Sequence, residues 1–203
     1  MILVGYMDSP FVRRVAVTMQ HYGMPYERNV ISVFRDADAV RAINPLGMVP
    51  SLTVDDGETI FDSRAILDYL DETMGQNALM PASGSERRNI QKITAIALGA
   101  VEKAVYLVYE KRNRNPDKID PAMVERFEGQ VHSGLGWLED RAPAPWLAGN
   151  MMTHADVTAA IAVTFVINKH PHMFKPADYP KISALRDMAE ALPAFQAAPF
   201  LEE

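Results

Sequence analysis

The chain has 203 residues, of which 48% are hydrophobic, and its formal net charge is −6. This length suits one large domain or two small ones, with enough apolar residues for a buried core. Nucleic-acid-binding proteins are usually basic, so the negative charge argues against a nucleic-acid partner. The chain contains no cysteine, which excludes disulfides, thiolate zinc sites and a cysteine nucleophile.

The sequence also bears on the cellular compartment. Absence of cysteine is compatible with a reducing environment. No apolar run approaches the ~20 residues that span a membrane, and the first residues lack the basic lead and cleavage site of a signal peptide. We therefore expect a cytoplasmic protein without a membrane partner.

Residues 1–76 mix strand and helix patterns. The opening strand–helix–strand segment predicts a βαβ unit with parallel strands. Asp56-Gly57 lies between two alternating runs and predicts a hairpin that adds an antiparallel edge. The expected elements are strands at 2–6 and 26–31, helices at 10–22, 36–43 and 63–74, and a hairpin over 50–61.

Residues 77–86 are rich in turn formers and are expected to link this part to a second domain over 87–203. Apolar positions there recur with the helical period, and no strand is expected. The predicted fold is therefore α/β followed by an all-helical bundle. The expected helices lie at 87–111, 121–141, 154–168, 180–191 and 194–198.

Ser9 and Pro10 stand directly before an apolar-periodic run in "DSPFVRRV". Ser at the N-cap with Pro at the first helical position is a common helix start. The same place suits a hydroxyl that faces an anionic ligand at a helix N-terminus. From these residues alone, Ser9 is a cap, a catalytic group or both.

Val49-Pro50 stands at the entry to a strand in "NPLGMVPSL". The base rate favours a trans bond, because only about 5–6% of X-Pro bonds in folded proteins are cis. A cis bond would instead turn the N–H and C=O of Val49 outward, where they would pair with an extended peptide-like ligand.

Two further helix starts carry polar residues. Asp62 and Ser63 suit simple capping, or recognition of a ligand's carboxylate and ammonium groups. Thr153 and Asp156 have capping-box spacing, which we interpret as a folding signal and not as an acid–base pair.

The longest predicted helix holds Tyr106 and Tyr109 on one face, where they line a ligand cleft or pack against the other half. The histidines show no metal-ligand spacing, so no metal site is expected. "HPH" at 170–172 is interpreted as a solvated helix exit.

In this order, "YMDSPFVRRV", "NPLGMVPSL", "FDSRAILDYL" and "GNMMTHADV" resemble the cytosolic glutathione transferase family, in particular its bacterial members with an active-site serine. The resemblance covers essentially the whole chain. It implies a thioredoxin-like N-terminal domain, a helical C-terminal domain, a homodimer and a cis bond before Pro50. It also implies detoxification with glutathione as co-substrate and no permanently bound cofactor.

The resemblance assigns a role to individual residues. Ser9 matches the catalytic serine, and Tyr6 is the rival donor. Val49, before Pro50, matches the residue whose backbone pairs with the cysteinyl unit of glutathione.

At the other contacts the chain departs from the family's pattern. Asp62 and Ser63 match the acidic-Ser pair that holds the γ-glutamyl end, although the family more often has Glu first. Met48 stands where many relatives have Lys or Gln, so Arg35 becomes the substitute candidate for the glycyl carboxylate.

These residues predict a glutathione transferase in which the Ser9 hydroxyl stabilises the thiolate. The thiolate attacks a small hydrophobic electrophile held between the two halves, with Phe11, Tyr106 and Tyr109 as pocket candidates. Two alternatives stay open. One is a glutathione-dependent isomerase, dehalogenase or peroxidase, and the other is a non-catalytic binding or regulatory protein.

Overall fold

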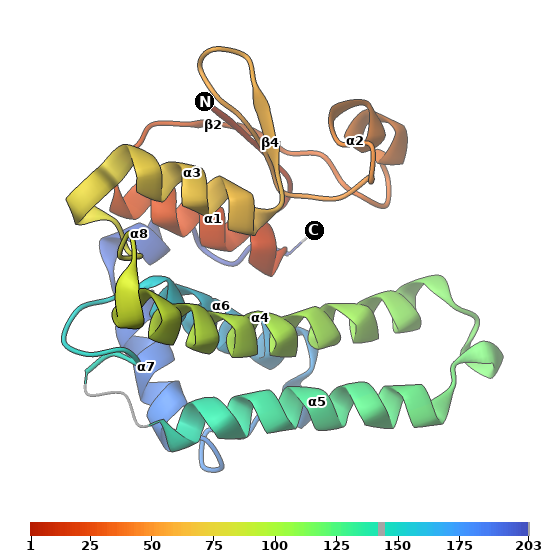
Figure 1. The fold of residues 1–203 in the computed structure, drawn as a ribbon. Coiled ribbons are helices and arrows are strands. Elements are labelled where there is room, and N and C mark those ends of the chain that lie inside the picture. Colours follow the sequence, from red (N-terminus) through yellow and green to blue (C-terminus); the bar gives the residue numbers. More distant parts are fainter. Residues whose placement is uncertain (142–144, 203) are drawn as a thin grey trace. The chain divides into compact units, whose positions relative to one another are not determined.

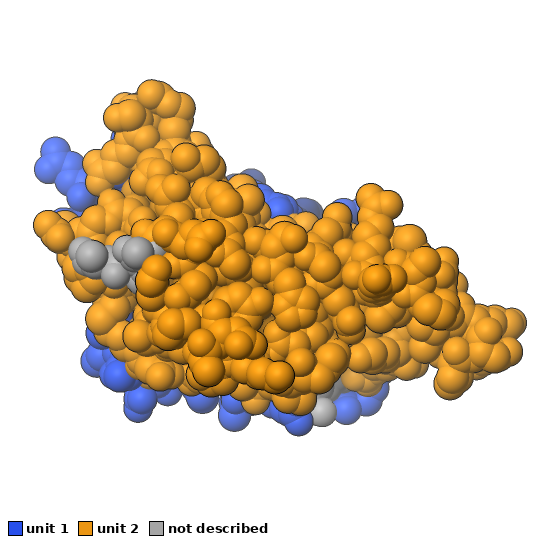
Figure 2. Space-filling view, turned by 90° about the horizontal axis from the view of Figure 1, so that it is seen from below, with its two compact units in different colours: residues 1–82, 191–203 blue, residues 83–190 orange. Residues whose placement is uncertain are grey.

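The computed structural model describes residues 1–141 and 145–202. They form two compact units, coloured separately in Figure 2. Unit 1 consists of residues 1–82 and 191–203, and unit 2 consists of residues 83–190. Each unit has a core of its own.

Unit 1 is built on a four-stranded sheet with the order β2-β1-β3-β4. β1 runs parallel to β2, and β3 is antiparallel to both β1 and β4. The predicted βαβ unit and edge hairpin are therefore confirmed. The strands are β1 (Ile2–Val4), β2 (Glu27–Asn29), β3 (Ser51–Thr53) and β4 (Thr59–Phe61).

Two amphipathic helices of unit 1, α1 (Pro10–His21) and α3 (Ser63–Met74), pack side by side against the sheet (Figure 1). Their apolar faces are fully buried, because their hydrophobic residues recur at helical spacing on one side. The short α2 (Ala37–Ile43) lies apart from this pair, and η1 (Gly75–Asn77) follows α3. This arrangement confirms the thioredoxin-like N-terminal part.

In the described residues of unit 2, the regular elements are all helices, and the β-structure is limited to an isolated bridge between Trp146 and Gly149. The long helix α4 (Gly84–Asn113) packs against both α5 (Pro121–Asp140) and α6 (His154–Lys169). α6 is apolar on all sides and buried for most of its length, as a central bundle helix must be. The remaining elements are η2 (Pro116–Lys118), η3 (Pro171–Met173) and α7 (Pro180–Glu190). The predicted helical C-terminal part is confirmed.

The division into units differs from the expected boundaries at both ends of the helical half. α4 begins at Gly84, inside the expected linker, because Ser83 is extended and Glu86 supplies an acidic residue in the first turn. The chain end, with α8 (Pro193–Gln196), belongs to unit 1 instead of the helical half. It is held there by α1, where Arg13 Nε donates to the carbonyl of Ala198 at 2.9 Å.

His170 departs from the expected solvated helix exit. It is buried in unit 2, and its Nε2 lies 2.8 Å from the carbonyl oxygen of Ala104 on α4. His172 is exposed and pairs with Glu128. In the described part of the chain, no helix combines the length and apolarity needed to cross a membrane.

Candidate active site

The strand register of unit 1 gathers four chain segments at one end of the sheet. Val4 is paired with Asn29 on one side and with Ser51 on the other, and Ser51 is paired with Phe61. The segments that leave β1, β2 and β4 and the segment that enters β3 therefore meet at this end. Every candidate glutathione-contact residue lies on one of them, namely Tyr6, Ser9, Arg35, Val49, Pro50, Asp62 and Ser63. We call this group the strand-end site.

Ser9 is the N-cap of α1, and Pro10 takes the first helical position. The predicted cap is confirmed: Ser9 Oγ accepts from the backbone N–H of Val12, at 3.4 Å. This is long compared with the ~2.9–3.0 Å typical of an N–H···O bond. Ser9 is also partly exposed, so its hydroxyl hydrogen is available for a ligand.

The bond between Val49 and Pro50 is cis, as the resemblance implied and the base rate did not. Val49 is half-buried, whereas the neighbouring Met48 is 57% exposed. The close approach of this loop to α1 depends on Gly5, which has a φ of +125°. A Cβ at Gly5 would lie 2.6 Å from Val12 Cγ2 and 3.0 Å from Val49 Cβ.

Asn44 holds the loop that leads to Val49, and the sequence did not single it out. The residue is buried, its Nδ2 donates to the carbonyl of Met48 at 2.9 Å, and its Oδ1 accepts from the N–H of Leu46 at 3.0 Å. The signal that was available is Asn-Pro before a glycine, which favours a turn stabilised by the Asn side chain.

Asp62 and Ser63 start α3, as predicted. Asp62 is the N-cap and accepts from the N–H of Arg64 at 2.7 Å. Its φ of +65° is the only positive φ of a non-glycine residue in the described ranges. Such backbone strain costs about 1–3 kcal/mol and clusters at functional sites. Ser63 is buried, and its Oγ accepts from Arg14 Nη1 at 3.3 Å.

Arg35 and Tyr6 are in contact. Arg35 Nη2 donates to the Tyr6 hydroxyl at 2.7 Å, and the guanidinium lies over the Tyr6 ring, 5.6 Å from its centroid. Arg35 is placed by its loop, where Ser32 Oγ accepts the backbone N–H groups of Phe34 and Arg35 at 3.1 Å each. The Tyr6 oxygen thus accepts from a cation, and its own hydrogen is left for another acceptor.

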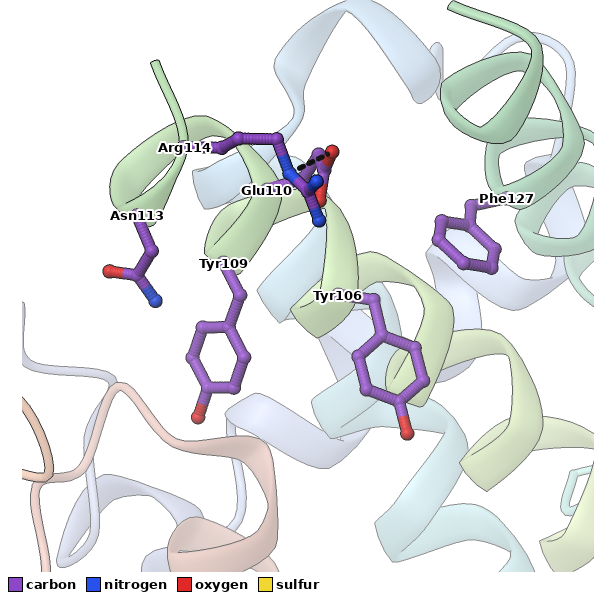
Figure 3. A pocket seen from close by; sticks show the side chains of 6 residues that line it. All are labelled: Tyr106, Tyr109, Glu110, Asn113, Arg114 and Phe127. Atoms are coloured by element: carbon purple, nitrogen blue, oxygen red, sulfur yellow. Dashed lines mark ion pairs between the residues drawn. The ribbon is translucent and has the colours of Figure 1, made fainter. Parts of the chain in front are cut away.

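Unit 2 contains a pocket of about 420 Å³ between the last turns of α4 and the first turns of α5. Figure 3 shows the rings of Tyr106 and Tyr109 projecting side by side from α4. Tyr106 and Phe127 have ring centroids 5.8 Å apart, and Lys103 Nζ lies 4.9 Å from the Tyr106 centroid. The lining residues, which we call the α4–α5 pocket, are Tyr106, Tyr109, Glu110, Asn113, Arg114 and Phe127.

Two of the three predicted pocket candidates line this pocket, and one does not. Tyr106 and Tyr109 do, whereas Phe11 lies half-buried in the first turn of α1 in unit 1. The sequence missed Glu110, whose carboxylate pairs with Arg114 Nε at 2.7 Å. Helical spacing from Tyr106 through 109, 110 and 113 was the signal that could have found this face.

The capping box at the start of α6 is structural, as predicted. Asp156 is fully buried and accepts from the N–H and the hydroxyl of Thr153, each at 2.8 Å, and from the N–H of Leu147 at 2.7 Å. Burial raises the pKa of the Asp156 carboxyl, and these hydrogen bonds oppose the rise. All of its partners are local, so the residue stabilises the fold of unit 2.

Family models match both units. Residues 3–78 match the glutathione S-transferase N-terminal domain, and residues 102–198 match the glutathione S-transferase C-terminal domain. The chain is 27% identical to an uncharacterized GST-like protein, YibF, of Escherichia coli K12, over 82% of each chain. It is also 27% identical to maleylacetoacetate isomerase of Rattus norvegicus, over 96% of this chain and 90% of the relative.

The fold is also that of solved structures. A glutathione transferase family member from Pseudomonas fluorescens Pf-5, solved with bound glutathione, superposes with a TM-score of 0.88. The two chains are 29% identical, and the match covers 97% of each.

Proposed function

Because the chain belongs to the glutathione S-transferase family, we propose that it binds glutathione at the strand-end site and activates the thiol of glutathione. The observation that carries this proposal is the strand register, which brings Ser9, Val49 and Asp62 to one end of the sheet. These residues lie on separate segments of the sequence, so their meeting is a property of the fold. The bound tripeptide is the co-substrate, and no metal or permanent cofactor takes part.

Each part of glutathione has a candidate contact. The N–H and C=O of Val49 pair with the cysteinyl unit, as in strand addition. Asp62 accepts from the γ-glutamyl ammonium, and Ser63 with the first turn of α3 binds the carboxylate beside it. Arg35, which reaches Tyr6 at this end of the sheet, is the candidate for the glycyl carboxylate. Met48 supplies no charge for that role.

Ser9 is the candidate for stabilising the thiolate of glutathione. A thiol with a pKa near ~8.5 is only a few per cent thiolate at neutral pH. Lowering that pKa by about two units requires about 2.7 kcal/mol of preferential stabilisation of the anion. A hydrogen bond to a charged acceptor supplies ~1.5–3 kcal/mol, and a helix N-terminus adds ~0.3–1 kcal/mol. Ser9 therefore acts as a donor to the sulfur anion, neither as a base nor as a nucleophile.

The activated thiolate forms a bond to carbon in a small electrophile. The α4–α5 pocket is the candidate for the electrophile's apolar part, since three aromatic rings line it. In a transferase the electrophile's leaving group departs, or an activated double bond takes up a proton, and glutathione is consumed.

Variants of Ser9 separate the catalytic role from the cap. Ser9→Gly removes the hydroxyl but costs only about a few tenths of a kcal/mol as a cap, whereas Ser9→Ala costs about 1 kcal/mol. We expect both to lose about 10- to 100-fold in turnover of an aryl halide, the equivalent of one charge-assisted hydrogen bond. Glutathione affinity, measured by calorimetry, should stay close to the wild-type value.

The same measurements test the proposal as a whole. Wild-type protein that fails to bind millimolar glutathione is not a glutathione enzyme. Binding without turnover of any electrophile or isomer in a panel supports the non-catalytic alternative. Full turnover in both Ser9 variants removes Ser9 from the mechanism, and Tyr6→Phe then tests the second hydroxyl at this site.

A glutathione-dependent isomerase is the second candidate function, favoured by the match to the rat isomerase over nearly the whole chain. In such a reaction the thiolate adds to an activated double bond, the bond rotates, and elimination returns the thiolate. Glutathione is then not consumed, in contrast to a transferase. Chromatography of glutathione and product, with a cis-enedione acid and an aryl halide as substrates, distinguishes the two reactions.

A further inference from the structure

Two consecutive arginines, Arg13 and Arg14, lie on the buried face of α1, with exposures of 1% and 3%. Arg13 has a structural explanation. Its Nε donates to the carbonyl of Ala198 at 2.9 Å, and its guanidinium lies 5.7 Å from the Phe195 ring centroid. It therefore fastens the chain end to unit 1.

Arg14 has different surroundings. Its Nη1 donates to Ser63 Oγ at 3.3 Å, and its Nε is buried without a hydrogen-bond partner among the described residues. Burial, with the nearby Arg64, lowers the pKa of Arg14 to about 9, although the carboxylates of Asp62 and Asp71 oppose this. The guanidinium is thus charged at neutral pH, and its hydrogen bonds and neighbouring carboxylates only partly offset the cost of burying that charge.

A buried charge of this kind requires a compensating partner, because an uncompensated one is strongly destabilising. Replacing Arg14 by an apolar residue of similar volume would remove that cost. We therefore expect the Arg14 guanidinium to contribute to ligand binding. In the ligand-bound protein, a negatively charged group of the ligand would balance its positive charge.

We propose that Arg14 is a positioning residue for the γ-glutamyl carboxylate of glutathione, acting through Ser63. Ser63 Oγ accepts a hydrogen bond from the Arg14 guanidinium. The hydroxyl hydrogen of Ser63 therefore points away from Arg14 and is donated to another acceptor. A hydroxyl has one donor and two acceptor positions, and the bond from Arg14 selects the donor for the ligand. The positive charge behind Ser63 also attracts the carboxylate in a buried setting, where screening is weak. This inference rests on the proposed binding of glutathione.

The test compares Arg14→Met with Arg13→Met, because both variants remove a buried guanidinium from the same helix and only Arg14 contacts Ser63. Calorimetry measures the Kd of three ligands: glutathione, its γ-glutamyl carboxamide and its glycyl carboxamide. For wild-type protein we expect glutathione to bind about 10-fold or more tightly than the γ-glutamyl carboxamide, as for a lost charge-assisted hydrogen bond. Circular dichroism and thermal unfolding establish that each variant is folded.

Arg14→Met should reduce that preference to about 2-fold or less, while the preference over the glycyl carboxamide stays at the wild-type value. Arg13→Met should leave both preferences unchanged. In the Ser63→Ala background, Arg14→Met should have less effect than in wild-type protein, because the contribution that Arg14 makes through the Ser63 hydroxyl is already lost. Arg14→Lys keeps the charge and should recover part of the preference for glutathione over its γ-glutamyl carboxamide. If Arg14 had only a structural role, Arg14→Lys would not recover this preference.

If Arg14→Met does not fold, Arg14→Leu takes its place, because it likewise removes both the charge and the donor to Ser63. An unchanged preference for the γ-glutamyl carboxylate in either folded variant overturns the inference, as does an equal loss in Arg13→Met. In both cases the binding of glutathione itself still stands. Wild-type protein that does not bind glutathione overturns the proposed function and this inference together.

Discussion

The strand-end site of unit 1 draws its residues from four chain segments, whereas the α4–α5 pocket of unit 2 takes nearly all of its lining from one helix end. The first uses backbone groups and short side chains at element ends, supported by buried polar residues such as Asn44 and Arg14. The second uses large side chains, and both of its tyrosines are exposed.

This difference matches the two tasks in the proposed reaction. Glutathione is the same in every reaction, and the strand-end site that would bind it is built from segments that contact one another, so a change in one segment disturbs the others. A variable electrophile is served by side chains that project from one helix, where one substitution changes a contact without moving the backbone. The comparison therefore predicts that substitutions which disturb the backbone of the strand-end site have coupled effects on stability and binding, and that those in unit 2 have separable ones.

The largest expected effect comes from Gly5→Ala. Its positive φ would cost about 1–3 kcal/mol, and the added Cβ would press on Val12 and Val49 at a cost of about 1–3 kcal/mol. We expect the free energy of unfolding, measured with denaturant, to fall by about 3 kcal/mol, and glutathione affinity to fall with it.

Gly57→Ala is the matched control for this variant. Gly57 also has a positive φ, of +92°, but a Cβ there would meet nothing within 4 Å. It should lose only about 1 kcal/mol, from backbone strain, and keep its glutathione affinity. Equal losses in the two variants would mean that the close approach at Gly5 does not matter.

A smaller effect is expected in unit 2, from two glycines of α5. A Cβ at Gly134 would lie 2.8 Å from the Cβ of Ala100 on α4, whereas one at Gly129 would meet nothing within 4 Å. Gly129→Ala should stabilise by about 1 kcal/mol through helix propensity. Gly134→Ala should instead destabilise by about 1 kcal/mol, because crowding of about 1–3 kcal/mol outweighs that gain.

Denaturant unfolding of both α5 variants checks this difference of about 2 kcal/mol. The Kd of glutathione should be unchanged in each, since the substitutions lie outside unit 1. Loss of glutathione affinity in folded Gly134→Ala would contradict the separation between the two regions.

Asp62→Asn should weaken glutathione binding by about 10-fold, through loss of a charged acceptor for the ammonium group. Stability should change by less than about 0.5 kcal/mol, because Asn caps a helix as well as Asp does and tolerates a positive φ. Asp120→Asn is the control: Asp120 caps α5 in the same way, accepting from the N–H of Ala122 at 2.9 Å. A loss of affinity in both variants would argue against a direct contact by Asp62.

The sequence predicted the order of strands and helices because hydrophobic period, Asp56-Gly57 and the Ser9 and Thr153 caps are local signals. It could not decide the Val49-Pro50 bond from the residues, and the resemblance supplied the correct alternative. The candidate site residues were identified through the family's motifs, because their common position depends on strand register.

What the sequence missed depends on contacts between distant segments. Arg14 was read only as part of a motif, and its bond to Ser63 joins α1 to α3. The chain end looked like part of the helical bundle, but Phe195 and Ala198 are buried in unit 1 by contact with α1. His170 looked like a solvated helix exit because its partner, Ala104, lies on another helix.

His170 gives the smallest expected effect, which is a pH dependence of stability confined to unit 2. Burial lowers the pKa of His170, and the neighbouring Lys111 and His172 act in the same direction, while the carbonyl of Ala104 and Glu128 oppose them. The unfolded chain then takes up a proton at higher pH than the folded protein does. Stability is therefore lost as pH falls from the unfolded value of ~6.5 toward the lowered folded value.

Between pH 7.5 and 5.5, this single group should lower the free energy of unfolding, by at most about 1.4 kcal/mol for a reference pKa of ~6.5. Denaturant unfolding at both pH values, in wild-type protein and in His170→Gln, isolates the contribution as the difference between the two pH responses. His170→Gln removes the titration and should be less sensitive to acid, although it is less stable at pH 7.5 because the hydrogen bond to Ala104 is disturbed. Equal pH responses would mean that the folded protein accommodates the charged imidazole, for example by turning it toward Glu128.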